Sequence, residues 1–378
     1  MTTEITGDDG LSAVELQAVI GRVRALDRTS DPIHDGPAVG GSHAVHADRG
    51  DRAEEEFPAP TAGMVLHRVL AGSARTFLLN DMGDELVDEV KRCRTVDALN
   101  VLMRPGPLWA QAAASELDGL QRAETQTERI HQSRVAMRRI RSNLRTFRLL
   151  LDPAWGTTLR GELAWYGGRL GEVRDLHIIG DAVTITGPSV LEPEDVVRLD
   201  AVVTERMIAA LADISAERGG ARRFKLTEQM MVLWDGPAFK PKASRHAREV
   251  LPRMLHRAWH DLRGASRIAR KDPTDENLHK VRIRMKDLRY GCNTVALVEG
   301  GPARKTAKAA ERLQVKLGDL HDARYSIDWL QALATERPDL AGPIADLVYV
   351  LNDVASSARK GWKRELKQVE RLWRSWQG

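Results

Sequence analysis

Two segments of the chain place a histidine ahead of cationic side chains that recur every three or four residues. On an α-helix such side chains lie on one face, here within a stripe about 80° wide. Like charges stacked at i, i+4 cost roughly 0.2–0.5 kcal/mol per pair, and a solvated face would alternate them with acids. The pattern predicts two anion-binding faces, composed of His131, Arg134, Arg138, Arg141 and Arg145 in the first segment and His279, Arg282, Lys286 and Arg289 in the second.

The length of the first stripe constrains the anion. Arg134 and Arg145 are eleven residues apart, which is about 16 Å along a helix axis. A row of cations over this distance suits a linear polyanion better than a single phosphate, and the planar arginine fork can bind phosphate oxygens bidentately. His131 and His279 could each donate a hydrogen bond to phosphate, with nearby anionic charge favouring their protonated forms.

A third stripe follows the second histidine segment. Its counterpart in the first half of the chain keeps Arg169 but has Gly161 and Trp165 where further cations would align. The two halves are therefore predicted to contribute unequally to the site. The cations of the third stripe are Lys305, Lys308, Arg312 and Lys316.

The chain contains an internal repeat. The segment HQSRVAMRRIR (131–141) matches HKVRIRMKDLR (279–289), and RLGEVRD (169–175) matches KLGDLHD (316–322) in the same order and almost the same register. The match indicates a duplicated helical unit. Its glycines, Gly171 and Gly318, are interpreted as helix ends or points of close helix approach, and its aspartates, Asp175 and Asp322, as helix caps or partners of a neighbouring arginine.

The elements that position these stripes are predicted to be helices. From about residue 61 onward, apolar residues recur at three- and four-residue spacing, and Gly/Pro breaks separate the segments. We predict an all-α protein with an acidic, largely disordered tail or linker (1–60) and two helical bundles (61–220 and 221–378). Two antiparallel four-helix bundles related by a pseudo-twofold axis would place the two basic faces across a central groove.

The charge is unevenly distributed. Residues 1–60 contain twelve acidic residues and five arginines, which gives this segment a net charge of −7. Because the whole chain has a net charge of +4, the remaining residues carry +11. A basic body of this kind suggests a negatively charged partner. The acidic tail has two interpretations: a solubilising linker, or an intramolecular competitor for the basic groove.

Composition excludes several other classes. There is no run of 18 apolar residues and no secretory signal at the start of the sequence, and the two cysteines lie outside any CxxC spacing. We therefore predict a cytoplasmic protein with no membrane partner, no cofactor and no metal site, and the oligomeric state is left open. The nine tryptophans are interpreted mainly as core or inter-bundle packing.

With these residues in view, the chain resembles the conserved histidine α-helical domain (CHAD) family. The resemblance rests on the two histidine segments and the two LGxxxD blocks, and it covers roughly residues 62–378. It implies two four-helix bundles around a basic cavity that binds inorganic polyphosphate, and association with polyphosphate granules rather than catalysis.

The chain departs from the pattern in two places. Asp287 stands where the first copy has Arg139, and the helical projection predicts that it points away from the basic stripe. Many relatives carry an N-terminal triphosphate-tunnel domain with an ExExK strand, which is not found here. Triphosphatase activity is therefore not carried over.

Two other functions remain open from the residues. A nucleic-acid binder would use the same phosphate contacts, although the stripes contain no tryptophan or tyrosine for base stacking. A metal-dependent phosphohydrolase could use His279 with His321 and Asp322, but the first copy has Arg174 at the position of His321. The surrounding arginines would also repel a dication.

Overall fold

A computed structural model describes residues 59–81, 122–218 and 220–377. The predicted acidic tail, up to residue 58, lies outside these described residues. Within them the chain is built of α-helices joined by short 3₁₀ and π turns, with no β-strand. The prediction of an all-α protein is confirmed for this part of the chain.

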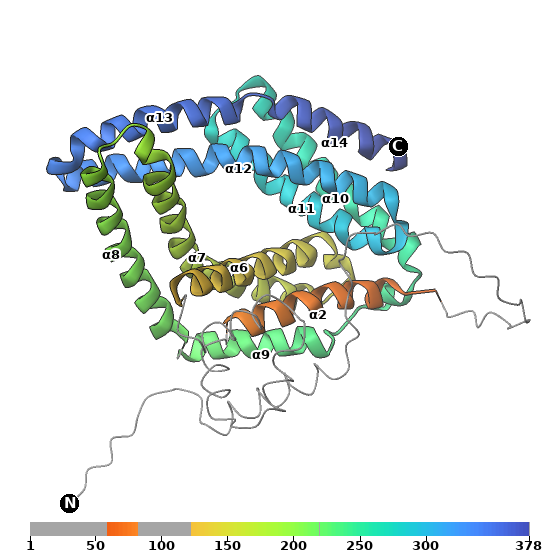
Figure 1. The fold of residues 1–378 in the computed structure, drawn as a ribbon. Helices are drawn as coiled ribbons and strands as arrows, with labels where there is room; N and C mark the ends of the chain where they lie inside the picture. The colour runs from red at the N-terminus through yellow and green to blue at the C-terminus, as the bar shows by residue number, and fades with distance from the viewer. Residues whose placement is uncertain (1–58, 82–121, 219, 378) are drawn as a thin grey trace, which may run out of the picture.

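The helices of the first half form a layer and a hairpin. Helix α2 (Ala62–Asp81) packs against α6 (Arg122–Thr146) and α9 (Ala221–Asp235), and the three lie side by side in the lower part of Figure 1. Helices α7 (Pro153–Asp181) and α8 (Pro193–Arg218) pair with each other and run from this layer to the second half.

The second half is a set of five packed helices. They are α10 (Ala247–Lys271), α11 (Asp275–Glu299), α12 (Gly301–Glu336), α13 (Ala341–Arg359) and α14 (Trp362–Gln377). Helix α11 packs against α10, α12 and also α6, so the helices that carry the two histidine segments are in contact. The division at residues 220/221 stays a prediction; it falls just before α9, which packs on α2.

Local sequence signals begin and end several of these helices. The Asp152 carboxylate accepts a hydrogen bond from the Trp155 amide at 2.8 Å, and Pro153 occupies the first turn of α7. Thr274 caps α11 in the same way. Gly300, with φ of +65°, separates α11 from α12 in a conformation that glycine adopts without steric cost.

The core is apolar and continuous between the two halves. Trp259, Trp362 and Trp373 are buried, and five further tryptophans, Trp155, Trp165, Trp234, Trp329 and Trp376, pack against this core. The packing role predicted for the tryptophans is thus confirmed for these eight; Trp109 lies outside the described residues.

One charged pair is buried where α2, α7 and α9 meet. The Arg223 guanidinium forms an ion pair with Asp81, and Tyr166 donates a hydrogen bond of 2.6 Å to the same carboxylate. Arg223 also lies over the rings of Phe77 and Tyr166, each 5.2 Å away. Burial lowers the pKa of Arg223 to about 9. No local sequence pattern indicates this pair, whose members are 142 positions apart.

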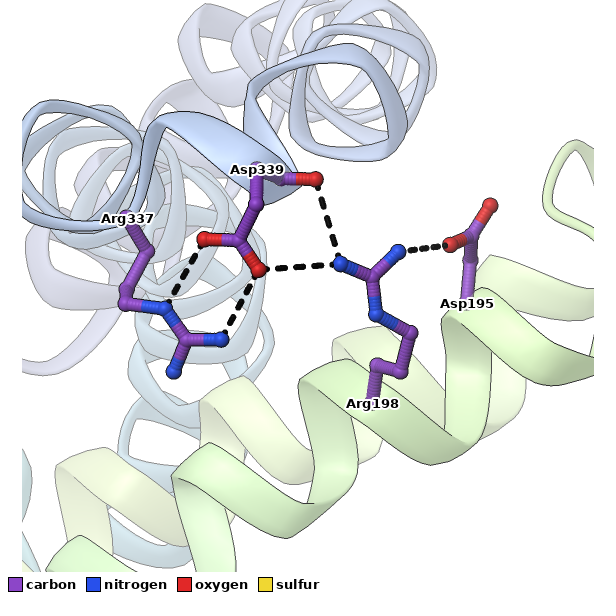
Figure 2. A network of polar contacts seen from close by, with 4 residues as sticks. All are labelled: Asp195, Arg198, Arg337 and Asp339. Carbon is purple, nitrogen blue, oxygen red and sulfur yellow. Dashed lines mark hydrogen bonds and ion pairs between the residues drawn. The ribbon is translucent and has the colours of Figure 1, made fainter.

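A second set of ion pairs joins the α7–α8 hairpin to the second half at the surface. Figure 2 shows Arg198 of α8 reaching Asp339, with an Nη2 to Oδ2 distance of 2.9 Å, while it also contacts Asp195 of its own helix at 3.0 Å. Arg337 pairs with the same Asp339. The bonds from Arg337 and Arg198 lower the pKa of Asp339 to about 2. The far end of the hairpin is therefore held to the end of α12.

Candidate anion-binding site

Helices α6 and α11 bring four of the predicted cations together. We name Arg134, Arg138, Arg282 and Lys286 the central cluster. Burial, and then the positive charges of Arg282, Arg138 and Arg134, lower the pKa of Lys286 to about 7. Two helices that are distant in sequence thus place their cations within mutual electrostatic range, as the duplicated stripes predict.

In each half, one arginine of the central cluster lies against the helix that carries the repeated LGxxxD block, α7 in the first half and α12 in the second. Arg134 donates hydrogen bonds from Nη1 to the carbonyl oxygens of Leu170 (3.1 Å) and Gly171 (2.7 Å) of α7, and it lies 3.9 Å from Asp175. Burial lowers the pKa of Arg134 to about 10. In the second half, Arg282 lies 4.0 Å from Asp322 of α12.

These contacts decide between the interpretations of the repeated glycines and aspartates. Gly171 and Gly318 lie inside the continuous helices α7 and α12, so the helix-end interpretation is wrong. A Cβ atom at Gly171 would lie 3.5 Å from the Arg134 guanidinium, and one at Gly318 would lie 3.9 Å from that of Arg282. The close approach is therefore made by an arginine side chain. The aspartates hold these arginines and cap no helix.

The two histidines lie beside the cluster, where burial and nearby cations disfavour their charged forms. Burial lowers the pKa of His131; Glu128 opposes this shift, and Arg174, Arg138 and Arg134 reinforce it. Burial likewise lowers the pKa of His279, whose ring lies 4.6 Å from that of His321. The free protein therefore disfavours the charged rings, and the charge of a bound anion would oppose this shift.

Arg141 and Arg145 belong to a separate group around Asp287. Arg145 contacts the Asp287 carboxylate at 2.7 Å, and Ser142 donates to its other oxygen at 2.8 Å. Asp287 points away from the basic stripe of its own helix, as the projection predicts. Helix α6 packs on that side of α11 and presents Arg145 of the first stripe to it, a contact that the projection does not predict.

The row on α12 lies on another face. Lys305, Lys308 and Arg312 are exposed, and Arg312 is 3.6 Å from Glu365 of α14. Lys316 is half-buried, with its Cε near Gly361 at the start of α14. Arg312 and Lys316 therefore border α14, whereas Arg282 meets α12 at Gly318 and Asp322. The charges of Lys316 and Arg282 both act on Asp319, so this end of the row lies near the central cluster.

Two further predicted residues are engaged elsewhere. Arg289 reaches from α11 to Glu311 and Gln314 of α12, the latter at 3.2 Å. Arg169 is half-exposed and lies 3.6 Å from Glu217 of α8. Of the fourteen predicted residues, the structure therefore unites the central cluster with the two histidines, and it distributes the others around them.

Two cations that the sequence analysis left out of the site also contribute. The charge of Arg174 acts on His131 and Arg134 and on the aspartates of both halves, Asp175 and Asp322. In the repeated block, Arg174 stands at the position that His321 occupies in the second copy. This correspondence could have identified it. Arg160 of α7 lies near Arg141 and Arg145, and no spacing rule marked it.

The described residues give two further facts about the site. They contain no group of three or more His, Cys, Asp or Glu that could hold a metal ion. Three buried nitrogen atoms, Arg138 Nε, Arg282 Nε and His279 Nδ1, have no hydrogen-bond partner among them. Buried polar atoms are generally satisfied, so these nitrogens are available to a ligand.

The fold and the site together define an all-helical protein in which duplicated cationic helices meet at a buried cluster. The family model of the CHAD domain matches residues 110–331. The chain belongs to the CHAD domain family.

Two solved structures share this fold. The CHAD domain from the plant Ricinus communis is 18% identical, with a TM-score of 0.58, over 86% of this chain and 97% of that one. PptA from Streptomyces chartreusis is 19% identical, with a TM-score of 0.54, over 84% of this chain and 100% of that one. No curated protein matches the sequence. In the described ranges, no helix has both the length and the apolar character needed to cross a bilayer.

Proposed function

We propose that this protein binds inorganic polyphosphate, without catalysis, through the central cluster and the histidines beside it. The observation that carries the proposal is the meeting of Arg134 and Arg138 with Arg282 and Lys286 at the contact between α6 and α11. Asp175 and Asp322 lie near two of the arginines. Arg138 and Lys286 have no ion pair within the described residues.

The cluster is better suited to a bound anion than to solvent. Its cations are partly desolvated, and each lies in the field of the others, which is unfavourable until negative charge enters. Phosphate oxygens would accept hydrogen bonds from Arg138 Nε and Arg282 Nε, which have no partner among the described residues. A bound anion would therefore relieve both the repulsion and the unmet hydrogen bonds.

A linear chain of phosphates fits the arrangement better than a single one. From the central cluster, α6 continues to Arg141 and Arg145, with Arg160 of α7 nearby. The distance from Arg134 to Arg145 is about 16 Å along the helix. Membership of the CHAD family supports polyphosphate as the chain, and binding to it would bring the protein to polyphosphate granules.

The proposal is tested by competition. We expect long-chain polyphosphate to bind with an affinity that falls steeply with salt, because each neutralised phosphate releases condensed counterions. Long-chain polyphosphate and single-stranded RNA, at matched phosphate concentration, would compete for a labelled polyphosphate in fluorescence anisotropy. A strong preference for RNA would contradict the proposal. A tagged protein that stays diffuse in cells containing granules would contradict only the granule part.

The lowered pKa of Lys286 predicts a pH dependence. A bound polyanion raises this pKa above its value of about 7 in the free protein, so binding takes up a proton. The affinity should therefore fall as the pH rises above 7, by at most about tenfold per pH unit for one proton. Isothermal titration calorimetry at pH 7.0 and 8.5 measures this change in polyphosphate affinity.

The control for this experiment is Lys286→Arg, which keeps its charge throughout this range. Its affinity should change much less between pH 7.0 and 8.5. A native affinity that is flat over the range, or an equal slope in the Lys286→Arg variant, would show that Lys286 does not take up the proton.

A further inference from the structure

A second basic surface lies on the outside of the molecule, away from the central cluster. It begins on α10, where residues 253–271 contain six arginine or lysine residues and one acid, Asp261. All six are exposed, and Arg270 pairs with Glu370 of α14. The other five have no ion pair within the described residues. They lie in a sector about 120° wide, and they are Arg253, Arg257, Arg263, Arg267 and Lys271.

Helix α14 carries a similar row. Its two acids are engaged with neighbours, Glu365 with Arg312 of α12 and Glu370 with Arg270 of α10. Its apolar residues face the core. The exposed face, about 80° wide, keeps four cations without an acidic partner among the described residues, namely Lys363, Lys367, Arg371 and Arg374.

Side-chain contacts make these rows neighbours. The Trp259 ring of α10 stacks on Trp373 of α14 at 4.9 Å, and Arg270 donates to Glu370 at 2.8 Å, at the adjoining edges of the two rows. On the other side of α14, the Trp376 indole donates to Thr306 of α12 at 3.0 Å. Figure 1 shows α14 beside α12. The exposed Lys305 and Lys308 of α12 add a third row.

We propose that this outer basic face, formed by the exposed rows of α10, α14 and α12, binds the phosphate backbones of double-stranded nucleic acid without reading its sequence. A single polyanion chain would contact only one of these rows of cations, whereas the two backbones of a duplex could contact neighbouring rows. Helices α12 and α14 pack against each other, and packed helices lie about 8–10 Å apart. This spacing is comparable with the separation of the two backbones across the grooves of a duplex, about 6 and 12 Å.

Other features of the face favour this ligand. Nonspecific duplex binding depends on Arg and Lys contacts to phosphate, and the α10 row is mostly arginine. A membrane-bound helix would insert an apolar side, but Trp362, Leu366 and Trp373 of α14 are buried in the core. This inference goes beyond the proposed polyphosphate site and does not depend on it.

The test compares two triple variants of the full chain with equal changes in net charge. The face variant is Arg267→Glu/Lys367→Glu/Arg371→Glu. The control is Lys225→Glu/Lys240→Glu/Lys242→Glu, whose lysines are exposed on and after α9. Circular dichroism checks the helix content. Anisotropy with a labelled 20-base-pair duplex of mixed sequence measures binding at low and moderate salt, and calorimetry measures polyphosphate binding.

We expect the face variant to bind the duplex at least tenfold more weakly, with a shallower salt dependence because about three phosphate contacts are lost. The control should stay within about threefold of the native affinity, and the polyphosphate affinity of the face variant should be nearly unchanged. The proposal is overturned if the native chain does not bind the duplex at low salt, or if face and control variants weaken equally. It is also overturned if the face variant loses polyphosphate as strongly as duplex, or if anionic vesicles bind this face and the duplex does not.

Discussion

We expect the Arg138→Glu/Lys286→Glu variant to bind polyphosphate more weakly than the native chain by a factor on the order of 100 or more. Hydrogen bonds to charged groups contribute about 1.5–3 kcal/mol each, and two lost contacts correspond to about two to four powers of ten at roughly 1.4 kcal/mol per tenfold change. The new carboxylates also repel phosphate. Isothermal titration calorimetry measures the loss.

The fold should tolerate this double change, because each new glutamate lies near a remaining arginine, Arg134 or Arg282. Circular dichroism should show native helix content. The matched control is Lys225→Glu/Lys242→Glu, which removes the same charge from exposed positions and should change affinity by no more than about threefold. Native affinity in a folded Arg138→Glu/Lys286→Glu variant would rule out the central cluster as the binding site.

The second large effect is expected at the buried pair of Asp81 and Arg223. Asp81→Ala leaves the Arg223 guanidinium buried without its carboxylate and removes the acceptor of the Tyr166 hydroxyl. Breaking a buried ion pair from one side costs about 3–5 kcal/mol. Urea denaturation followed by circular dichroism should show a loss of this size in the free energy of unfolding.

The matched control is Asp339→Ala at the surface network of Figure 2. It also removes a carboxylate shared by two arginines, Arg198 and Arg337, but all three groups are solvated. Exposed ion pairs contribute about 0–1 kcal/mol, so the loss should be small. Equal losses in the two variants would show that burial does not govern the contribution of Asp81.

The sequence predicted the helical class and the central cluster because both follow from periodicity along one chain. Helical projection gives the angle of a side chain about its own axis. It does not show which other helix that face meets, and for this reason the contact of Asp287 with Arg145 of α6 was not predicted. The α12 row was grouped with the other stripes for the same reason, although it borders α14.

The continuous helices through Gly171 and Gly318 were missed for a different reason. Glycine lowers helix propensity, so the sequence favours a helix end at both positions. Packing of α7 and α12 outweighs this cost, and the missing side chain leaves space for an arginine. The pair of Asp81 and Arg223 joins residues 142 positions apart, a separation over which no local pattern gives information.

If the central cluster binds polyphosphate as proposed, the contacts of Arg134 with Asp175 and of Arg282 with Asp322 affect how the site fills. Each arginine already has a carboxylate nearby, so an arriving phosphate takes part in an exchange of anions at these positions. In the free protein, the two aspartates keep both guanidinium groups oriented. The exchange lowers the net gain per phosphate, and it favours a ligand long enough to replace both carboxylates within a single binding event.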